Sequence, residues 1–163
     1  MHYAAINKFD IANGPGVRVS LFVSGCRRKC KGCFNREAWD FNYGEKFTWE
    51  TVHEIEQLLA GPHIQGLSIL GGDPFEPENR LEVMAVCAYL KHKLPDKDIW
   101  MWSGFSWEDI KDLPVLKYVD VLVDGPFIEG MKDLSLPYSG SRNQRVIDVQ
   151  ESLVADEVVL WEF

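Results

Sequence analysis

The 163-residue chain is predicted to be a single α/β domain built from parallel βα units. Short apolar runs alternate with segments of helical periodicity, and turn-forming glycines follow several of the apolar runs. No repeat, low-complexity tract or linker interrupts the pattern. Because 46% of the residues are hydrophobic, one domain over residues 1–163 can bury a substantial core.

The first half of the chain supplies two strands and two helices. The alternating, β-branched run 17–23 follows the turn-forming run 13–16 and is predicted to be the first strand. Thr48 is suited to cap a helix that runs to Leu59. The apolar run 66–70 is the second predicted strand, and the helix that follows it is predicted over 77–94.

The second half continues the alternation. The remaining predicted elements are a strand over 98–102, a helix over 106–112, a strand over 119–123 and weaker strands over 145–149 and 157–163. Such alternation predicts βαβ units with right-handed crossovers. A complete eight-fold barrel needs about 250 residues. The chain can therefore form only part of a barrel, or else an open doubly wound sheet, and both place ligands at the carboxyl ends of the strands.

Composition excludes some classes of function. The formal net charge of −8 argues against a nucleic-acid-binding protein, which normally carries a basic face. Residues 1–14 lack the basic and apolar regions of a secretory signal. No stretch approaches the roughly 20 apolar residues of a membrane span. We therefore expect a cytoplasmic protein without nucleic-acid or membrane partners.

Three cysteines, Cys26, Cys30 and Cys33, are crowded into the loop after the first predicted strand. Core packing does not explain this spacing, and in a reducing compartment it indicates metal binding or catalysis. No fourth ligand lies nearby, which predicts an open coordination position where chemistry can occur. The fourth cysteine, Cys87, lies on the apolar stripe of a predicted helix and is expected in the core.

Two metal centres are compatible with these thiols. A zinc site would need a distant fourth ligand, and none of the four histidines lies in ligand spacing. An iron–sulfur cubane fits the short loop better, because three thiolates can hold it and leave one iron free. Zinc in a binding domain without catalysis remains the alternative, and brown protein with iron and sulfide would separate the two.

Four cations, Arg27, Arg28, Lys29 and Lys31, lie between the thiols. Positive charge favours ionised sulfur and partly balances an anionic cluster. In an acidic protein it also suits docking of an acidic electron donor. Ordinary surface charges on a solvated loop are the competing interpretation.

With these features the chain resembles the radical S-adenosylmethionine (SAM) enzymes, and within them the activating proteins of anaerobic ribonucleoside-triphosphate reductases. The motifs spread from residue 13 to about residue 147, so the resemblance covers nearly the whole chain. They are Asn13-Gly-Pro-Gly-Val-Arg18, Ser24-Gly-Cys26, Cys30-Lys-Gly-Cys-Phe-Asn35, Gly71-Gly-Asp-Pro74, Trp102-Ser-Gly104, Val123-Asp-Gly-Pro-Phe127 and Gly140-Ser-Arg-Asn-Gln144.

The resemblance implies a partial, incomplete TIM-type barrel with the radical SAM fold. It implies that Cys26, Cys30 and Cys33 ligate one [4Fe-4S] cluster and that SAM chelates the free iron. Reductive cleavage of SAM would then generate a glycyl radical on the large subunit of the reductase, with electrons from a donor such as flavodoxin. A radical SAM enzyme acting on a small molecule, or on another glycyl-radical enzyme, is the nearest alternative.

The expected SAM contacts are of two kinds. Gly71 and Gly72 would let the backbone approach the amino group of SAM, and Asp73 would add a charge-assisted contact. A Gly-Gly-Asp-Pro turn without a ligand is the competing interpretation. Many radical SAM enzymes place a large residue just before the third cysteine, where this chain has Gly32. The adenine is therefore assigned to Gly32, Cys33 and Phe34, with Asn35 as a further polar partner.

Two further features carry weaker expectations. Trp100 and Trp102 point to the same face of their predicted strand, where core packing is favoured over a cofactor role. The apolar segment 154–163 suggests an added edge strand or an interface, and no role is assigned to it.

Overall fold

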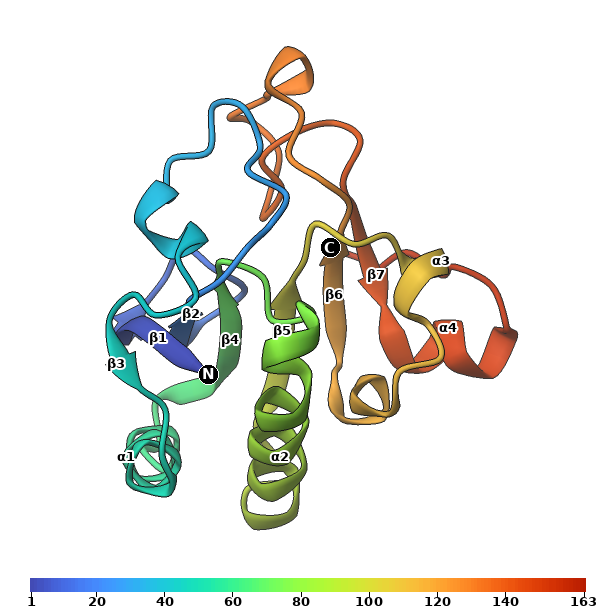
Figure 1. The fold of residues 1–163 in the computed structure, drawn as a ribbon. Helices are drawn as coiled ribbons and strands as arrows, with labels where there is room; N and C mark the ends of the chain where they lie inside the picture. The colour runs from blue at the N-terminus through green and yellow to red at the C-terminus, as the bar shows by residue number, and fades with distance from the viewer.

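The computed structural model describes residues 1–163 and has one mixed sheet of seven strands in the order β3-β1-β2-β4-β5-β6-β7 (Figure 1). The strands are β1 His2–Asp10, β2 Val17–Val23, β3 Glu45–Lys46, β4 Ile64–Gly71, β5 Asp98–Trp102, β6 Val121–Asp124 and β7 Arg145–Asp148. The helices are α1 Trp49–Leu59, α2 Pro77–Lys93, α3 Trp107–Ile110 and α4 Val149–Ala155, with 3₁₀ turns η1 Arg36–Trp39, η2 Pro114–Tyr118 and η3 Glu129–Met131. The predicted α/β class is confirmed.

The centre of the sheet is parallel, and its edges are antiparallel. Strands β2, β4, β5 and β6 run parallel to one another, whereas β1 pairs antiparallel with β2 and β7 pairs antiparallel with β6. The parallel register aligns Leu21 with Ile69, Ile69 with Met101 and Met101 with Leu122. The carboxyl ends of these four strands therefore lie along one edge, and β3 and β7 leave the sheet open at its sides.

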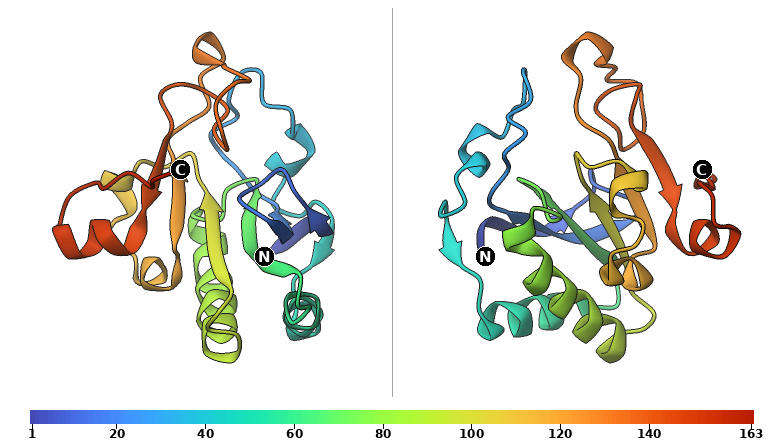
Figure 2. Two further views of the ribbon diagram at one scale, coloured as in Figure 1. Left: turned by 180° about the vertical axis from the view of Figure 1, so that it is seen from behind. Right: turned by 45° about the vertical axis from the view of Figure 1, so that its right-hand side comes forward.

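The two faces of the sheet differ. Alternate strand residues pack with α1, α2, η2 and α4 into one large core on the helical face. Figure 1 shows α2 in front of β5 and α1 below the sheet, and the view from behind in Figure 2 brings β5 in front of α2. The opposite face carries a separate small cluster of Trp100, Val121, Val123 and Val146.

Local sequence signals explain where the main helices begin and end. Thr48 forms a capping box with Thr51 at the start of α1, as the predicted cap requires. Pro77 occupies the first turn of α2, where its missing N–H costs nothing, and Pro95 lies just beyond the end of the helix. Cys87 is fully buried on α2, which confirms its place in the core. None of the helices combines the length and apolar character needed to cross a membrane.

The main differences from expectation concern three segments. The structure has a long first strand, β1, in a segment with little alternation, because antiparallel pairing with β2 supplies its partner. The predicted strand over 157–163 is wrong: this segment is irregular and makes only one isolated bridge, between Ile147 and Leu160. The helix α4 was missed, although its cap Asp148 and Glu151 three residues later form a recognisable helix start.

Candidate functional site

A cavity of about 400 Å³ lies at the carboxyl edge of the parallel strands. The loop after β2 and the loop between β6 and β7 rise beyond this edge, at the top of Figure 1. Residues of the predicted site that line the cavity are Cys26, Cys30, Cys33, Phe34, Gly71, Gly72 and Asp73. The structure thus brings the cysteine loop and the Gly-Gly-Asp turn together, as expected for adjacent parallel strands.

The cysteine loop is held at its base by backbone hydrogen bonds to η1. Gly25 N–H donates to the Ala38 carbonyl at 2.7 Å, and Cys26 N–H donates to the Trp39 carbonyl at 3.3 Å. Gly25 has φ +106°, and a Cβ there would lie 2.2 Å from the Phe41 ring. A glycine is therefore required at this turn into the cysteine loop.

The donor set fits an iron–sulfur cluster. Cys26, Cys30 and Cys33 are all free, partly exposed thiols that line the same cavity, and Cys33 N–H closes a turn onto the Cys30 carbonyl at 3.1 Å. No three metal-binding side chains converge on one point. A cubane does not require such convergence, because each thiolate binds a different iron. Burial, reinforced by the nearby Asp73 carboxylate, raises the pKa of the Cys26 thiol.

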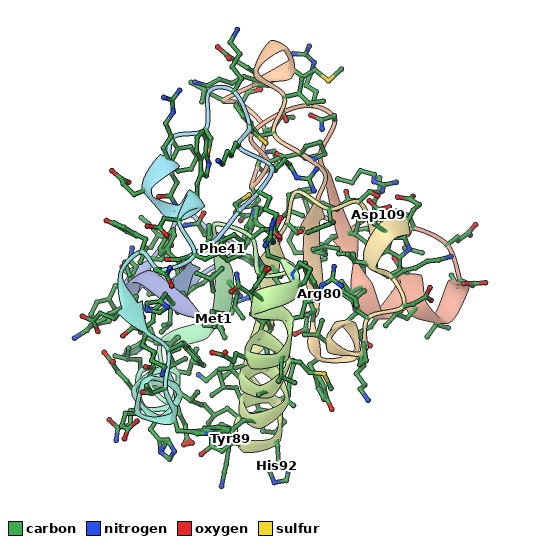
Figure 3. The ribbon with its side chains drawn as sticks, in the orientation of Figure 1. Met1, Phe41, Arg80, Tyr89, His92 and Asp109 are labelled. Carbon is green, nitrogen blue, oxygen red and sulfur yellow. The ribbon has the colours of Figure 1, made fainter.

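Arg27 anchors the cysteine loop to α2. Its guanidinium pairs with Glu76 at 2.8 Å and with Glu78, and its backbone N–H donates to the Glu76 carboxylate at 2.9 Å. Glu76 is 5% exposed, so the Arg27–Glu76 ion pair neutralises a largely buried carboxylate. The guanidinium also lies 4.7 Å from the ring centroid of Phe41, which is labelled in Figure 3.

The other three cations of the loop make no ion pair. Arg28 lies 5.0 Å from the ring centroid of Phe105 and lines the cavity. Lys29 and Lys31 are exposed. The four cations therefore divide into one structural anchor, one cavity residue and two surface charges. The guanidinium of Arg80, on the first turns of α2 in Figure 3, lies 5.7 Å from the centroid of the same Phe105 ring.

Gly71 and Gly72 are required by the close approach of β2 and its loop. A Cβ on Gly71 would lie 2.5 Å from the Val23 carbonyl oxygen, and Gly71 has φ +114°. A Cβ on Gly72 would lie 2.6 Å from the Gly25 carbonyl oxygen and 2.8 Å from that of Ala38. Packing of the protein's own backbone thus accounts for both glycines, in addition to any ligand that approaches them.

Asp73 links the end of β4 to the end of β5. Its carboxylate accepts hydrogen bonds from the Ser103 hydroxyl at 2.8 Å, from Gly104 N–H at 2.9 Å and from Phe75 N–H at 3.0 Å. Burial raises the pKa of this carboxyl, and the three hydrogen bonds and Arg28 oppose the shift. With three of about four acceptor positions occupied, the side chain has room for one further donor.

The residues assigned to the adenine side are placed differently from one another. Phe34 is 97% exposed at the rim of the cavity, and Asn35 lines it. Gly32 lies outside the lining, with φ +81° and with Glu129 3.2 Å from the position a Cβ would take. The absence of a side chain at Gly32 is therefore explained by backbone conformation and by packing against the β6–β7 loop.

Part of the cavity wall was missed by sequence reasoning. Tyr138 and Ser139 line it from the β6–β7 loop, and Ala12, Phe22 and Trp39 line it from the N-terminal part of the chain. Trp100 and Trp102 lie on one face as predicted, with ring centroids 5.9 Å apart. Trp100 is core, whereas Trp102 lines the cavity and donates its indole N–H to the Tyr138 carbonyl at 2.7 Å. No local pattern marks Tyr138, because a long irregular loop brings it to the site.

Comparison with known proteins gives a consistent result. The model of the family described as "4Fe-4S single cluster domain" matches residues 12–147, which include all three clustered cysteines. An anaerobic ribonucleoside-triphosphate reductase-activating protein of Enterobacteria phage T4 is 47% identical over 90% of this chain and 93% of its own length. Proteins of the same name from Vibrio cholerae and Escherichia coli K12 are 42% and 39% identical, over 88% and 90% of this chain and 96% and 97% of their own lengths.

The matched family and the three cavity thiols agree on a [4Fe-4S] cluster in preference to zinc. The relatives span nearly all of the chain at identities well above those of chance similarity. The chain therefore belongs to the family of anaerobic ribonucleoside-triphosphate reductase-activating proteins.

Proposed function

We propose that this protein is a radical SAM activase that generates the glycyl radical of an anaerobic ribonucleoside-triphosphate reductase. One observation carries the proposal: three thiols at the spacing Cys-x3-Cys-x2-Cys share a cavity with the Gly71-Gly72-Asp73 turn of the adjacent strand. The names of the relatives identify the reductase as the protein to be activated.

A partial TIM-type barrel of the radical SAM type is the architecture we assign to the fold. In a doubly wound sheet, helices cover both faces, whereas in a barrel they form only the outer layer. The helices here pack into one core on one face, and the other face holds only the small cluster around Trp100. This one-sided arrangement supports an open segment of a barrel, formed by one domain over residues 1–163.

In the proposed site Cys26, Cys30 and Cys33 hold the [4Fe-4S] cluster, and SAM occupies the remaining cavity. When bound, the cluster would supply the one-electron reduction of SAM, the chemistry that would place a radical on a glycine Cα of the reductase large subunit. The backbone of Gly71 and Gly72 and the carboxylate of Asp73 receive the SAM amino group.

On the adenine side, Cys33, Phe34 and Asn35 face the cavity, and Gly32 gives the loop its turn. The exposed Lys29 and Lys31 suit an acidic electron donor such as flavodoxin. The net charge of −8 supports the absence of a nucleic-acid partner, and the cytoplasm is the compartment we propose. Residues of the loop after β2 and of the β6–β7 loop line the cavity, and we expect a segment of the reductase to reach it beside these loops.

The decisive experiment is anaerobic reconstitution followed by incubation with SAM, a reductant and the reductase large subunit. We expect brown protein with near-stoichiometric iron and sulfide per cluster, cleavage of SAM, and a glycyl-radical EPR doublet on the reductase. Alanine at Cys26, Cys30 or Cys33 should abolish cleavage, whereas the matched control Cys87→Ala should retain it.

Each component has its own contrary result. Colourless protein that holds one zinc ion would exclude the cluster. Cleavage of SAM without a doublet would exclude this reductase as the substrate and favour another glycyl-radical enzyme or a small molecule. Loss of the cluster in Cys87→Ala would show that the ligands are wrongly assigned.

A further inference from the structure

The segment after α4 folds back across the sheet face that has no helices. The Trp161 N–H donates to the Val146 carbonyl at 2.9 Å, and the Val159 carbonyl accepts from Asp148 N–H at 2.9 Å. These bonds attach the segment 157–163 to β7 and place its aromatic residues beside the small cluster on that face. The family match ends at residue 147, so it assigns no role to this segment.

The segment completes an aromatic cluster. Trp161 meets Trp100 edge to face with ring centroids 4.9 Å apart, and it meets Phe163 in the same way at 4.9 Å. Phe163 stacks on Tyr138 with a centroid distance of 6.0 Å and an interplanar angle of 17°. Tyr138 also meets Trp100 edge to face, with ring centroids 5.1 Å apart. The ring of Tyr138 therefore contacts both strand β5 and the segment 157–163.

Tyr138 has an unusual backbone. Its φ is +64°, in the left-handed region that a bulky side chain rarely adopts. Such a conformation persists only where the surroundings determine it strongly. Two kinds of contact do so here: the ring contacts with Trp100 and Phe163, and the hydrogen bond from the Trp102 indole N–H to the Tyr138 carbonyl at 2.7 Å.

This strained residue forms part of the cavity wall. Tyr138, Ser139 and Gly140 all line the cavity, in the β6–β7 loop, whereas the cysteines lie in the β2–β4 connection. Within the loop, Gly140 N–H donates to the Gln144 side chain at 2.7 Å, and the Gly140 carbonyl accepts from Asp133 N–H at 3.2 Å. These bonds fix Gly140, while Tyr138 is joined to Ser139 by the chain itself, so the position of Tyr138 affects the lining at Ser139 most directly.

We propose that Trp161 and Phe163 are positioning residues of the cofactor cavity. They hold Tyr138 in its left-handed conformation and thereby fix the wall 138–140 against which SAM is bound. The claim that this wall binds SAM rests on the function proposed above, whereas the claim that Trp161 and Phe163 position Tyr138 does not. The cysteine loop has separate anchors, in η1 and Arg27, so the cluster itself does not depend on the segment 157–163.

The test compares Phe163→Ala with the control Leu160→Ala. Both side chains are mostly exposed, 72% and 58%, but only Phe163 contacts the aromatic cluster. In the protein without cluster or SAM, amide hydrogen exchange in peptides covering 133–142 should accelerate about 2- to 13-fold in Phe163→Ala. Phe163→Ala removes two aromatic pairs, and this range corresponds to the one of them that touches the loop, Phe163–Tyr138, worth about 0.5–1.5 kcal/mol. Leu160→Ala and Phe163→Tyr, which keeps the ring, should match the parent.

The second measurement uses reconstituted protein and equilibrium binding of SAM. Phe163→Ala should raise the Kd for SAM by about the same 2- to 13-fold, with the iron and sulfide content unchanged. Unchanged exchange over 133–142, or equal acceleration across the whole chain, would show that Phe163 does not fix the conformation of the loop at Tyr138. Faster local exchange with an unchanged Kd would overturn the cofactor role. If the reconstituted parent itself bound no SAM, the proposed function would fail with the cofactor role, while the exchange result would still decide the structural part.

Discussion

Gly72→Ala should separate the Gly-Gly-Asp turn from the cysteine loop. A Cβ at this position would lie 2.6 Å from the Gly25 carbonyl oxygen, 2.8 Å from the Gly25 nitrogen and 2.8 Å from the Ala38 carbonyl oxygen. All three atoms belong to backbone, so no side chain can rotate away. Gly72 does not have a positive φ, and alanine is therefore excluded by packing rather than by its own conformation.

The cost follows from these distances. Ordinary van der Waals contact begins at 3.4 Å, so the loop must retreat by about 0.8 Å at its closest atom. That movement strains the hydrogen bonds from Asp73 N–H to the Gly25 carbonyl and from Gly25 N–H to the Ala38 carbonyl, at 2.8 and 2.7 Å. Overpacking of this kind costs about 1–3 kcal/mol of unfolding free energy. For a protein of this size the melting temperature should fall by about 2–12 °C.

Thermal unfolding of the protein without cluster measures this effect, with Gly130→Ala as the matched control. A Cβ on Gly130 meets nothing within 4 Å, so that variant carries the same loss of chain entropy in the unfolded state without the clash. Gly72→Ala should also bind less iron and sulfide on reconstitution, because the cysteine loop has moved. Equal melting temperatures for the two variants, with equal iron content, would show that the backbone of Gly25 and Ala38 does not approach Gly72 closely enough to exclude a Cβ.

Three further predictions concern single side chains. Asp73→Asn replaces one acceptor oxygen by an NH₂ group, so a donor such as Gly104 N–H loses its partner; urea unfolding should show a loss of about 1–3 kcal/mol, and an unchanged midpoint would contradict it. Burial raises the pKa of the Cys87 thiol to about 12, so thiol reagents at pH 8 should modify only the other cysteines of the folded protein; labelling of Cys87 at the same rate would contradict its burial. Arg27 lowers the pKa of Glu78 from 4.5 to about 2, so the contribution of this pair is present above pH 4.5 and is lost as the pH falls toward 2. The difference in unfolding free energy between the parent and Glu78→Gln should narrow as the pH falls from 4.5 toward 2. A difference that stays constant over this interval would show that the Arg27–Glu78 pair does not contribute to stability.

Sequence patterns located the centre of the fold well because they reflect burial. The predicted strand over 17–23 and the predicted helix from the Thr48 cap to Leu59 match β2 and α1, and the strand over 98–102 matches β5. In these segments side-chain burial and local preference agree. Strand β1 has only Tyr3 and Asp10 buried, so its strand conformation depends on pairing rather than on its own pattern.

The segment 157–163 failed as a strand for the opposite reason. Its apolar residues suggest β structure, but its aromatic side chains pack sideways onto Trp100 and Tyr138 instead of alternating across a sheet. Contacts of that kind join residues from three distant parts of the chain. A single sequence contains no local signal for them, and the role of Tyr138 in the cavity wall could not be predicted for the same reason.

The Gly-Gly-Asp turn shows how one motif can serve both the fold and the ligand. From sequence, its glycines and carboxylate suggested contacts to the amino end of a ligand. In the structure Gly71 and Gly72 admit the backbone of β2 and its loop, and Asp73 binds the end of β5. These contacts bring three strand ends together at the place where the thiols face the cavity. A substitution in this turn therefore alters the distance between the thiols and the ligand pocket even when it removes no ligand contact. If such a variant no longer cleaves SAM, its iron and sulfide content must be measured first, because a displaced cluster would give the same loss of activity as a lost SAM contact.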